Sequence, residues 1–190
     1  MSFSSLFDNY GVTTVVVLLW LSLYFILVLW IFVYRYFSIL MILSEEEKCL
    51  ESVLNGRNTL PKNSLLGSSL VGIDKKLTEH MLQYALDKAI KDATIGLTFL
   101  AIVASTAPFI GLFGTVVEIL EAFSKLGDNS RATLDVIAPV ISKALVATAA
   151  GILTAIPAYS FNLFLKRKVF ELNTCLQLQI NVLISPKTSN

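Results

Sequence analysis

The charged residues of this chain leave three long apolar gaps between them. No Asp, Glu, Lys or Arg occurs in residues 9–34, 93–117 or 144–165, which are 26, 25 and 22 residues long. A helix needs roughly 20 apolar residues to cross the hydrocarbon core of a bilayer. Backbone polar groups in lipid must bond within their own segment, so each gap is predicted to be a transmembrane helix.

Helical patterns continue beyond the second and third gaps. Residues 74–91 lead into the second gap without a helix breaker, which predicts one helix from about residue 74 to residue 123. The third helix is predicted to start near residue 130, after an outer turn at 127–130, and to run past Lys168. The fold class is therefore all-α, an integral membrane protein with three transmembrane helices and long cytoplasmic extensions of helices two and three.

The distribution of basic residues predicts the topology. Residues 35–92 and 166–190 together hold twelve Lys and Arg, whereas residues 118–143 hold three and residues 1–10 hold none. Since cytoplasmic segments are enriched in Lys and Arg, the N-terminus is predicted to lie outside and the C-terminus inside. Cys49 falls on the inner side, where a thiol reagent that cannot cross the membrane should not reach it.

The topology divides the chain into four regions. They are an outer tip with the first transmembrane helix (1–43), a cytoplasmic region (44–91), a two-helix membrane region (92–170) and a cytoplasmic tail (171–190). The composition agrees with a membrane protein, because 55% of the residues are hydrophobic and 15% are charged, against about 25% charged in soluble domains. The net charge of +1 gives no sign of nucleic-acid binding.

Small residues recur at spacings of three and four in the second and third gaps, whereas bulky side chains fill the first. Such a face lets two helices approach closely in lipid, and its smallest members are Gly111, Gly114 and Gly151. Pro108 and Pro157 each remove a backbone donor, so their helices are expected to bend there.

Thr115 and Thr148 place hydroxyl groups inside these apolar gaps. Each hydroxyl can bond a carbonyl one turn back in its own helix, or it can line a polar path. Glu118 and Lys143 stand at the outer ends of the second and third helices, where they either pair or stay apart. No carboxylate lies within a gap, so any ionisable proton relay must come from another polypeptide.

The sequence predicts neither an enzyme active site nor a metal site. Cys49, Cys175 and His80 have no ligand spacing, so no metal site and no cofactor are predicted. No set of a nucleophile and a base stands at a membrane surface, so an enzyme is not expected.

The second and third gaps resemble the signatures of a known membrane family. Residues 107–116 (APFIGLFGTV) are similar to the second-helix signature of the ExbB/TolQ proton-channel proteins, a branch of the MotA/TolQ/ExbB superfamily. Residues 137–151 (IAPVISKALVATAAG), followed by Ala155 and Pro157, resemble the third-helix signature. The resemblance covers roughly residues 95–165 and identifies residues 92–170 as the channel region.

The resemblance implies a motor subunit of the bacterial inner membrane, with a periplasmic N-terminus and a cytoplasmic C-terminus. In this family five copies surround the helices of a single-span partner, ExbD or TolR, which carries a proton-binding aspartate. The complex uses proton-motive force to act on the outer membrane through TonB or TolA. Thr115 and Thr148 match the family's pore-lining threonines.

Two positions depart from the family pattern. Lys143 stands where the family commonly has Glu, and a cation there cannot act as an acidic relay. Glu118 stands where the family often has Gly. Two alternatives stay open: an oligomeric scaffold that conducts no ions, and a flagellar-type stator subunit, although that branch has four spans. The residues do not separate a TonB-like from a Tol-like system.

Overall fold

The described part of the chain is almost wholly helical. The computed structural model describes residues 12–54, 65, 79–127 and 134–184, and it has no strand within these ranges. The long helices are α2 (Val12–Leu54), α4 (Glu79–Thr94), α5 (Leu97–Gly127) and α6 (Leu134–Ile184). Three helical stretches are long and apolar enough to cross a membrane, namely Val12–Ser52, His80–Ser124 and Ala138–Val182. The predicted fold class is therefore confirmed, and the predicted turn at 127–130 falls largely outside the described residues.

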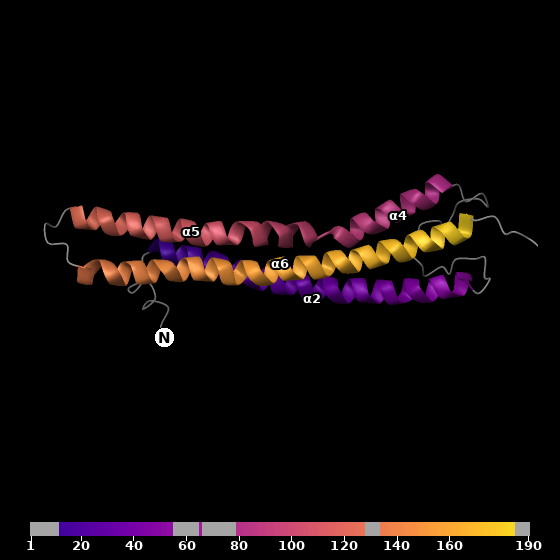
Figure 1. The fold of residues 1–190 in the computed structure, drawn as a ribbon, viewed down its shortest axis with the longest axis horizontal. Helices are drawn as coiled ribbons and strands as arrows, with labels where there is room; N and C mark the ends of the chain where they lie inside the picture. Colours follow the sequence, from indigo (N-terminus) through magenta and orange to yellow (C-terminus); the bar gives the residue numbers. More distant parts are fainter. Residues whose placement is uncertain (1–11, 55–64, 66–78, 128–133, 185–190) are drawn as a thin grey trace, which may run out of the picture. The chain divides into compact units, whose positions relative to one another are not determined.

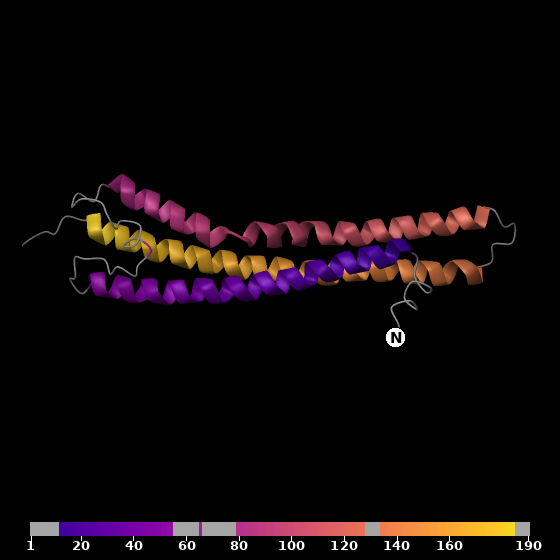
Figure 2. The ribbon, with the colours of Figure 1, turned by 180° about the vertical axis from the view of Figure 1, so that it is seen from behind.

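The chain divides into two compact units. Unit 1 combines α2 up to Ile31 with Phe99–Asn162, and unit 2 combines Phe32–Thr98 with the chain from Leu163 onward. Within unit 1, α2, α5 and α6 lie side by side (Figures 1 and 2). The four regions predicted from the topology stay a prediction.

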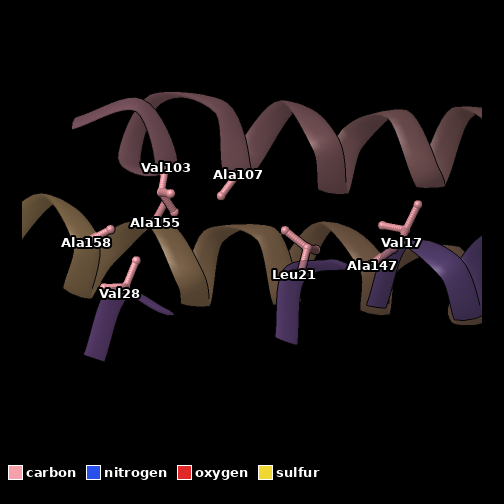
Figure 3. Packing of buried hydrophobic residues seen from close by; sticks show 8 residues of the cluster. All are labelled: Val17, Leu21, Val28, Val103, Ala107, Ala147, Ala155 and Ala158. Carbon is pink, nitrogen blue, oxygen red and sulfur yellow. The ribbon is translucent and has the colours of Figure 1, made fainter. Parts of the chain in front are cut away.

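Alanine and larger aliphatic side chains share the core of unit 1 (Figure 3). The buried cluster comes from all three helices: Val17, Leu21 and Val28 of α2, Val103 and Ala107 of α5, and Ala147, Ala155 and Ala158 of α6. In this cluster α6 contributes only alanine, so the larger side chains of α2 have room against it. Small residues at such an interface allow close backbone approach, which favours helix association in lipid.

The predicted second helix is broken between α4 and α5. Gly96 has a φ of 92°, a left-handed conformation that glycine adopts at little cost. Arg35 of α2 donates from Nη2 to the Asp92 carbonyl at 2.7 Å and from Nε to the Ile95 carbonyl. These bonds satisfy carbonyls that lose helical partners at the break. The prediction of one uninterrupted helix over 74–123 is therefore wrong, whereas α6 does continue as one helix.

Unit 2 contains a buried polar cluster that joins α2 to α6. Glu46 and Gln179 are 1% and 0% exposed. Gln179 Nε2 donates to Glu46 Oε2 at 2.9 Å and to the Glu46 carbonyl at 3.0 Å. The backbone N–H of Leu65 donates to Glu46 Oε1 at 2.6 Å. A buried polar group is tolerated when it is hydrogen-bonded in this way.

Replacing Glu46 by alanine is expected to destabilise unit 2. The change removes both carboxylate acceptors, and each buried donor left without a partner costs about 1–3 kcal/mol. Thermal unfolding of the purified chain in detergent should therefore show a lower midpoint. Glu45→Ala is the matched control, because Glu45 is exposed on the same turn of α2. An equal loss in both variants would show that the buried cluster contributes nothing specific.

Candidate functional site

The backbones of α5 and α6 come into close contact at two glycines. A Cβ on Gly111 would lie 2.6 Å from the backbone oxygen of Ala147, and a Cβ on Gly151 would lie 2.6 Å from that of Ala107. Real Cβ atoms essentially never approach another atom so closely. Only glycine therefore fits at these two positions without a shift of one helix, as the small-residue pattern indicates.

Gly114 marks the place where α2 joins this contact. A Cβ at Gly114 would lie 3.1 Å from Cγ1 of Val17 and 3.3 Å from Cβ of Ala147. These neighbours are side-chain atoms of α2 and α6. Gly114 and Val17 therefore lie at the same level of unit 1, which fixes the register of α2 against α5.

The glycine contact brings Thr115 and Thr148 together. Their hydroxyl oxygens lie 2.5 Å apart, and either can donate to the other. Thr115 Oγ1 also lies 3.1 Å from the Ala144 carbonyl and 3.3 Å from the Gly111 carbonyl, which stands one turn back in its own helix. Thr148 Oγ1 lies 3.4 Å from the same Gly111 carbonyl. Thr115 therefore makes the local bond that any helical threonine can make, and it also bonds across to α6.

The two hydroxyls differ in exposure. Thr115 is 9% exposed and lies between α5 and α6, whereas Thr148 is only partly buried. A group that approaches unit 1 from outside would therefore meet Thr148 first. Thr115 stands behind it and can exchange a hydrogen bond with it. The arrangement can offer either a donor or an acceptor to such a group, because each hydroxyl is both.

Because α5 and α6 are antiparallel, Pro108 and Pro157 lie on the same side of this pair along the two helices. Pro108 lies inside α5 and Pro157 inside α6, and both helices continue through them. Pro139 is a further proline inside α6 that the sequence analysis did not single out. Each proline lacks an N–H, so a carbonyl one turn earlier loses its helical donor. The bends expected at Pro108 and Pro157 stay a prediction.

Glu118 and Lys143 do not form an ion pair with each other in the described part of the chain. Glu118 is 6% exposed, and its Oε2 has no hydrogen-bond partner among the described residues. Lys143 is partly buried on α6. Of the two arrangements left open by the sequence, the structure has the one in which these side chains stay apart. No group of three or more possible metal ligands occurs among the described residues.

Sequence reasoning missed how deeply two acidic residues are buried. Glu46 lies within the acidic run 45–47, and Glu118 lies at the predicted outer end of the second helix. The spacing along each helix indicates this burial, because Glu46 follows the buried Leu43 by three residues and Glu118 follows the buried Gly114 by four. Residues three and four apart share one helix face. Both carboxylates therefore lie on the buried face of their helix.

Comparison with known proteins gives consistent matches. Residues 47–177 match the MotA/TolQ/ExbB proton channel family. The biopolymer transport protein ExbB-like 1 of Helicobacter pylori is 48% identical over 181 residues, which are 95% of this chain and 96% of that protein. The Tol-Pal system protein TolQ of Haemophilus influenzae is 46% identical over 83 residues, 44% of this chain and 36% of that one. The biopolymer transport protein ExbB of Xanthomonas campestris is 39% identical over 92 residues, 48% and 36% of the two chains.

Proposed function

Because the chain belongs to the MotA/TolQ/ExbB proton channel family, we propose that it is the channel subunit of a proton-driven motor in the inner membrane. Several copies, five if the family pattern holds, surround the helices of a single-span partner of the ExbD or TolR kind. A carboxylate on that partner carries the proton. The assembled motor uses proton-motive force for TonB- or Tol-type work at the outer membrane.

The hydroxyl pair of Thr115 and Thr148 is the observation that carries this proposal. The uncharged segments around it hold no ionisable group that could bind a proton within the bilayer. An unsolvated charge at the centre of a bilayer costs at least about 2.5–3.5 kcal/mol. A partner carboxylate that passes this level therefore needs polar contacts, and Thr148 is the more exposed of the two hydroxyls.

The pair suits both protonation states of such a carboxylate. When Thr115 donates to Thr148, the Thr148 hydroxyl is free to donate to an ionised carboxylate. When Thr148 donates to Thr115, Thr148 keeps a lone pair for a protonated carboxyl, and Thr115 donates to the Ala144 carbonyl 3.1 Å away. The Thr115–Thr148 hydrogen bond can therefore reverse its direction when the carboxylate gains or loses its proton, and neither helix has to move.

The outer surface of unit 1 supports an assembly of several copies. Large apolar side chains of α5 and α6 are exposed there, including Phe109, Phe113, Leu153 and Tyr159 at 61–70%. Exposed apolar side chains of this size contact lipid or another protein chain. Native mass spectrometry in detergent should therefore show a ring of several copies. Detection of monomers alone would contradict the assembly.

Proton uptake into liposomes tests the function itself. The purified chain is reconstituted with and without its partner, and internal pH is followed after a potential is imposed. We expect flux only when both are present, because the partner supplies the ionisable group. A scaffold without ion conduction would give no flux in either case, and full flux from this chain alone would contradict a partner-borne relay.

Copurification with a TonB- or TolA-type protein would then identify the system, since the relatives carry both ExbB and TolQ names.

The proposed orientation has α4 in the cytoplasm and the C-terminal end of α5 in the periplasm. Cys49 is a poor reporter of this orientation, because it is 5% exposed. Exposed positions serve better: Asp87→Cys on α4 and Ser124→Cys on α5, each in a background with Cys49→Ala and Cys175→Ala. In intact spheroplasts an impermeant thiol reagent should label Ser124→Cys and leave Asp87→Cys unmodified until the membrane is opened. The reverse pattern would overturn the orientation.

A further inference from the structure

The break between α4 and α5 stands at a glycine that suits two backbone conformations. Gly96 has a φ of 92°, which glycine adopts about as readily as the negative φ of a helix. α4 ends at Thr94 and α5 begins at Leu97, and the chain passes from unit 2 to unit 1 after Thr98. Gly96 therefore forms a joint at which the helix can be either broken or continuous.

The side chain of Arg35 replaces helical donors that the break removes. In a continuous helix each carbonyl accepts from the N–H four residues further along, and Asp92 and Ile95 would be served in this way. In the structure Arg35 donates from Nη2 to the Asp92 carbonyl at 2.7 Å and from Nε to the Ile95 carbonyl. Both carbonyls therefore have a donor in the broken form and would have one in the continuous form.

The contact of Arg35 joins two helices of unit 2. The guanidinium keeps its positive charge at any physiological pH, and it meets the C-terminal end of α4, where the helix dipole favours a cation. A hydrogen bond from a charged donor contributes more than one between neutral groups. The two bonds of Arg35 therefore hold the end of α4 against α2.

Apolar packing holds α4 by a small area. The buried side chains described in this helix are Leu82, Ala85, Leu86 and Ala93. Two of the four are alanine, and an alanine side chain buries little apolar surface. The position of α4 therefore depends on two leucines and on the contact with Arg35.

We propose that Arg35 and Gly96 form a conformational latch, in which Arg35 holds the broken helix and its release lets α4 turn about Gly96. In the released form the helix closes across Gly96, and its own N–H groups serve the carbonyls of Asp92 and Ile95. The latch gives α4 two positions relative to α2. It goes beyond the proposed function, because it requires neither a partner chain nor proton flux.

Distances between spin labels in unit 2 test the latch in the whole chain. The labels are attached to Asp87→Cys on α4 and Lys48→Cys on α2, both exposed positions, in a background with Cys49→Ala and Cys175→Ala. We expect one dominant distance in this parent and a second distance in Arg35→Met, which keeps an unbranched side chain and has no N–H donor. The ratio of latched to released form should fall at least about tenfold, since bonds to a charged donor are lost. Arg35→Lys should lie between the two, because an ammonium can still donate to one carbonyl.

Gly96→Ala tests the joint with Arg35 intact. Alanine disfavours a φ of 92°, so this change favours the continuous helix and should populate the same second distance. Arg167→Met is the matched control for the loss of an arginine. The Arg167 side chain is 79% exposed and pairs with Glu171 of its own helix at 3.2 Å, so its loss should leave the parent distance unchanged.

A second pair of labels separates a latch from a general loosening of unit 2. Lys48→Cys on α2 and Gln177→Cys on α6 are both exposed and do not include α4. Their distance should be the same in the parent, in Arg35→Met and in Gly96→Ala. A change in this distance, or the parent distance alone for the α4 pair in either variant, would overturn the latch. Gly96→Ala decides the question if Arg35→Met does not fold.

Discussion

Replacing Gly111 by alanine is expected to force α5 and α6 apart and to lower both the stability of the chain and its proton flux. The new Cβ would lie 2.6 Å from the Ala147 carbonyl oxygen and 3.1 Å from Cα of Thr148, and both are backbone atoms that cannot turn away. Overpacking of this kind costs about 1–3 kcal/mol. The shift also separates the hydroxyls of Thr115 and Thr148. Thermal unfolding in detergent should show a lower midpoint, and partner-dependent proton uptake should fall with it.

Gly114→Ala is the matched control for this contact. Its Cβ would meet side-chain atoms of Val17 at 3.1 Å and Ala147 at 3.3 Å, so a few tenths of an ångström of movement relieve the contact. We expect a small change in the unfolding midpoint and nearly normal flux. Gly151→Ala should behave like Gly111→Ala, because its Cβ would lie 2.6 Å from the Ala107 carbonyl oxygen. Equal effects at Gly111 and Gly114 would contradict a backbone contact specific to the first.

The membrane-spanning helices could be predicted because charge is excluded from lipid along the whole length of a span. That signal lies within each segment and does not depend on which other helices pack against it. The break at Gly96 could not be predicted in the same way. A single glycine is tolerated within a helix, and what fixes the break is Arg35, sixty residues earlier in the chain, which bonds the Ile95 carbonyl. A contact so distant in sequence leaves no trace in the local pattern.

The sequence predicts which residues form the site, but it does not predict the hydrogen bond between them. Thr115 and Thr148 stand out as hydroxyls in apolar segments, and the resemblance to the family selects the same two residues. Their mutual hydrogen bond depends on the close approach at Gly111 and Gly151, which requires the relative rotation of two helices. The burial of Glu118 depends likewise on the position of α2. Spacing along one helix gives a face, but it does not say which helix covers that face.

Thr148→Val is expected to abolish partner-dependent proton flux while the subunit still folds and assembles. Valine keeps the shape of threonine and replaces the hydroxyl by a methyl group. The lost contact leaves a carboxylate at this level without its nearest hydroxyl. If the unsolvated charge costs about 2.5–3.5 kcal/mol, the rate falls roughly a hundredfold, since each 1.36 kcal/mol is a factor of ten.

Thr115→Val should reduce flux in the same direction, for a different reason. Thr115 is buried behind Thr148, so its loss removes the group with which Thr148 exchanges a hydrogen bond. Thr148 could then donate only to a carboxylate or to the Gly111 carbonyl 3.4 Å away. Lys143→Ala should have a milder effect than either, because a lysine at this position cannot serve as the acidic relay.

Thr154→Val separates the specific role of the pair from the general loss of a hydroxyl. Thr154 is 4% exposed on the same helix as Thr148, and its hydroxyl donates to the Ala150 carbonyl of its own helix at 2.9 Å. Its removal changes a local bond only, so flux in liposomes with the partner should stay near the wild-type value. Wild-type flux in Thr148→Val would contradict a role for the hydroxyl pair. An equal loss in Thr154→Val would show that any buried hydroxyl in α6 has the same effect, which the connection between Thr115 and Thr148 does not predict.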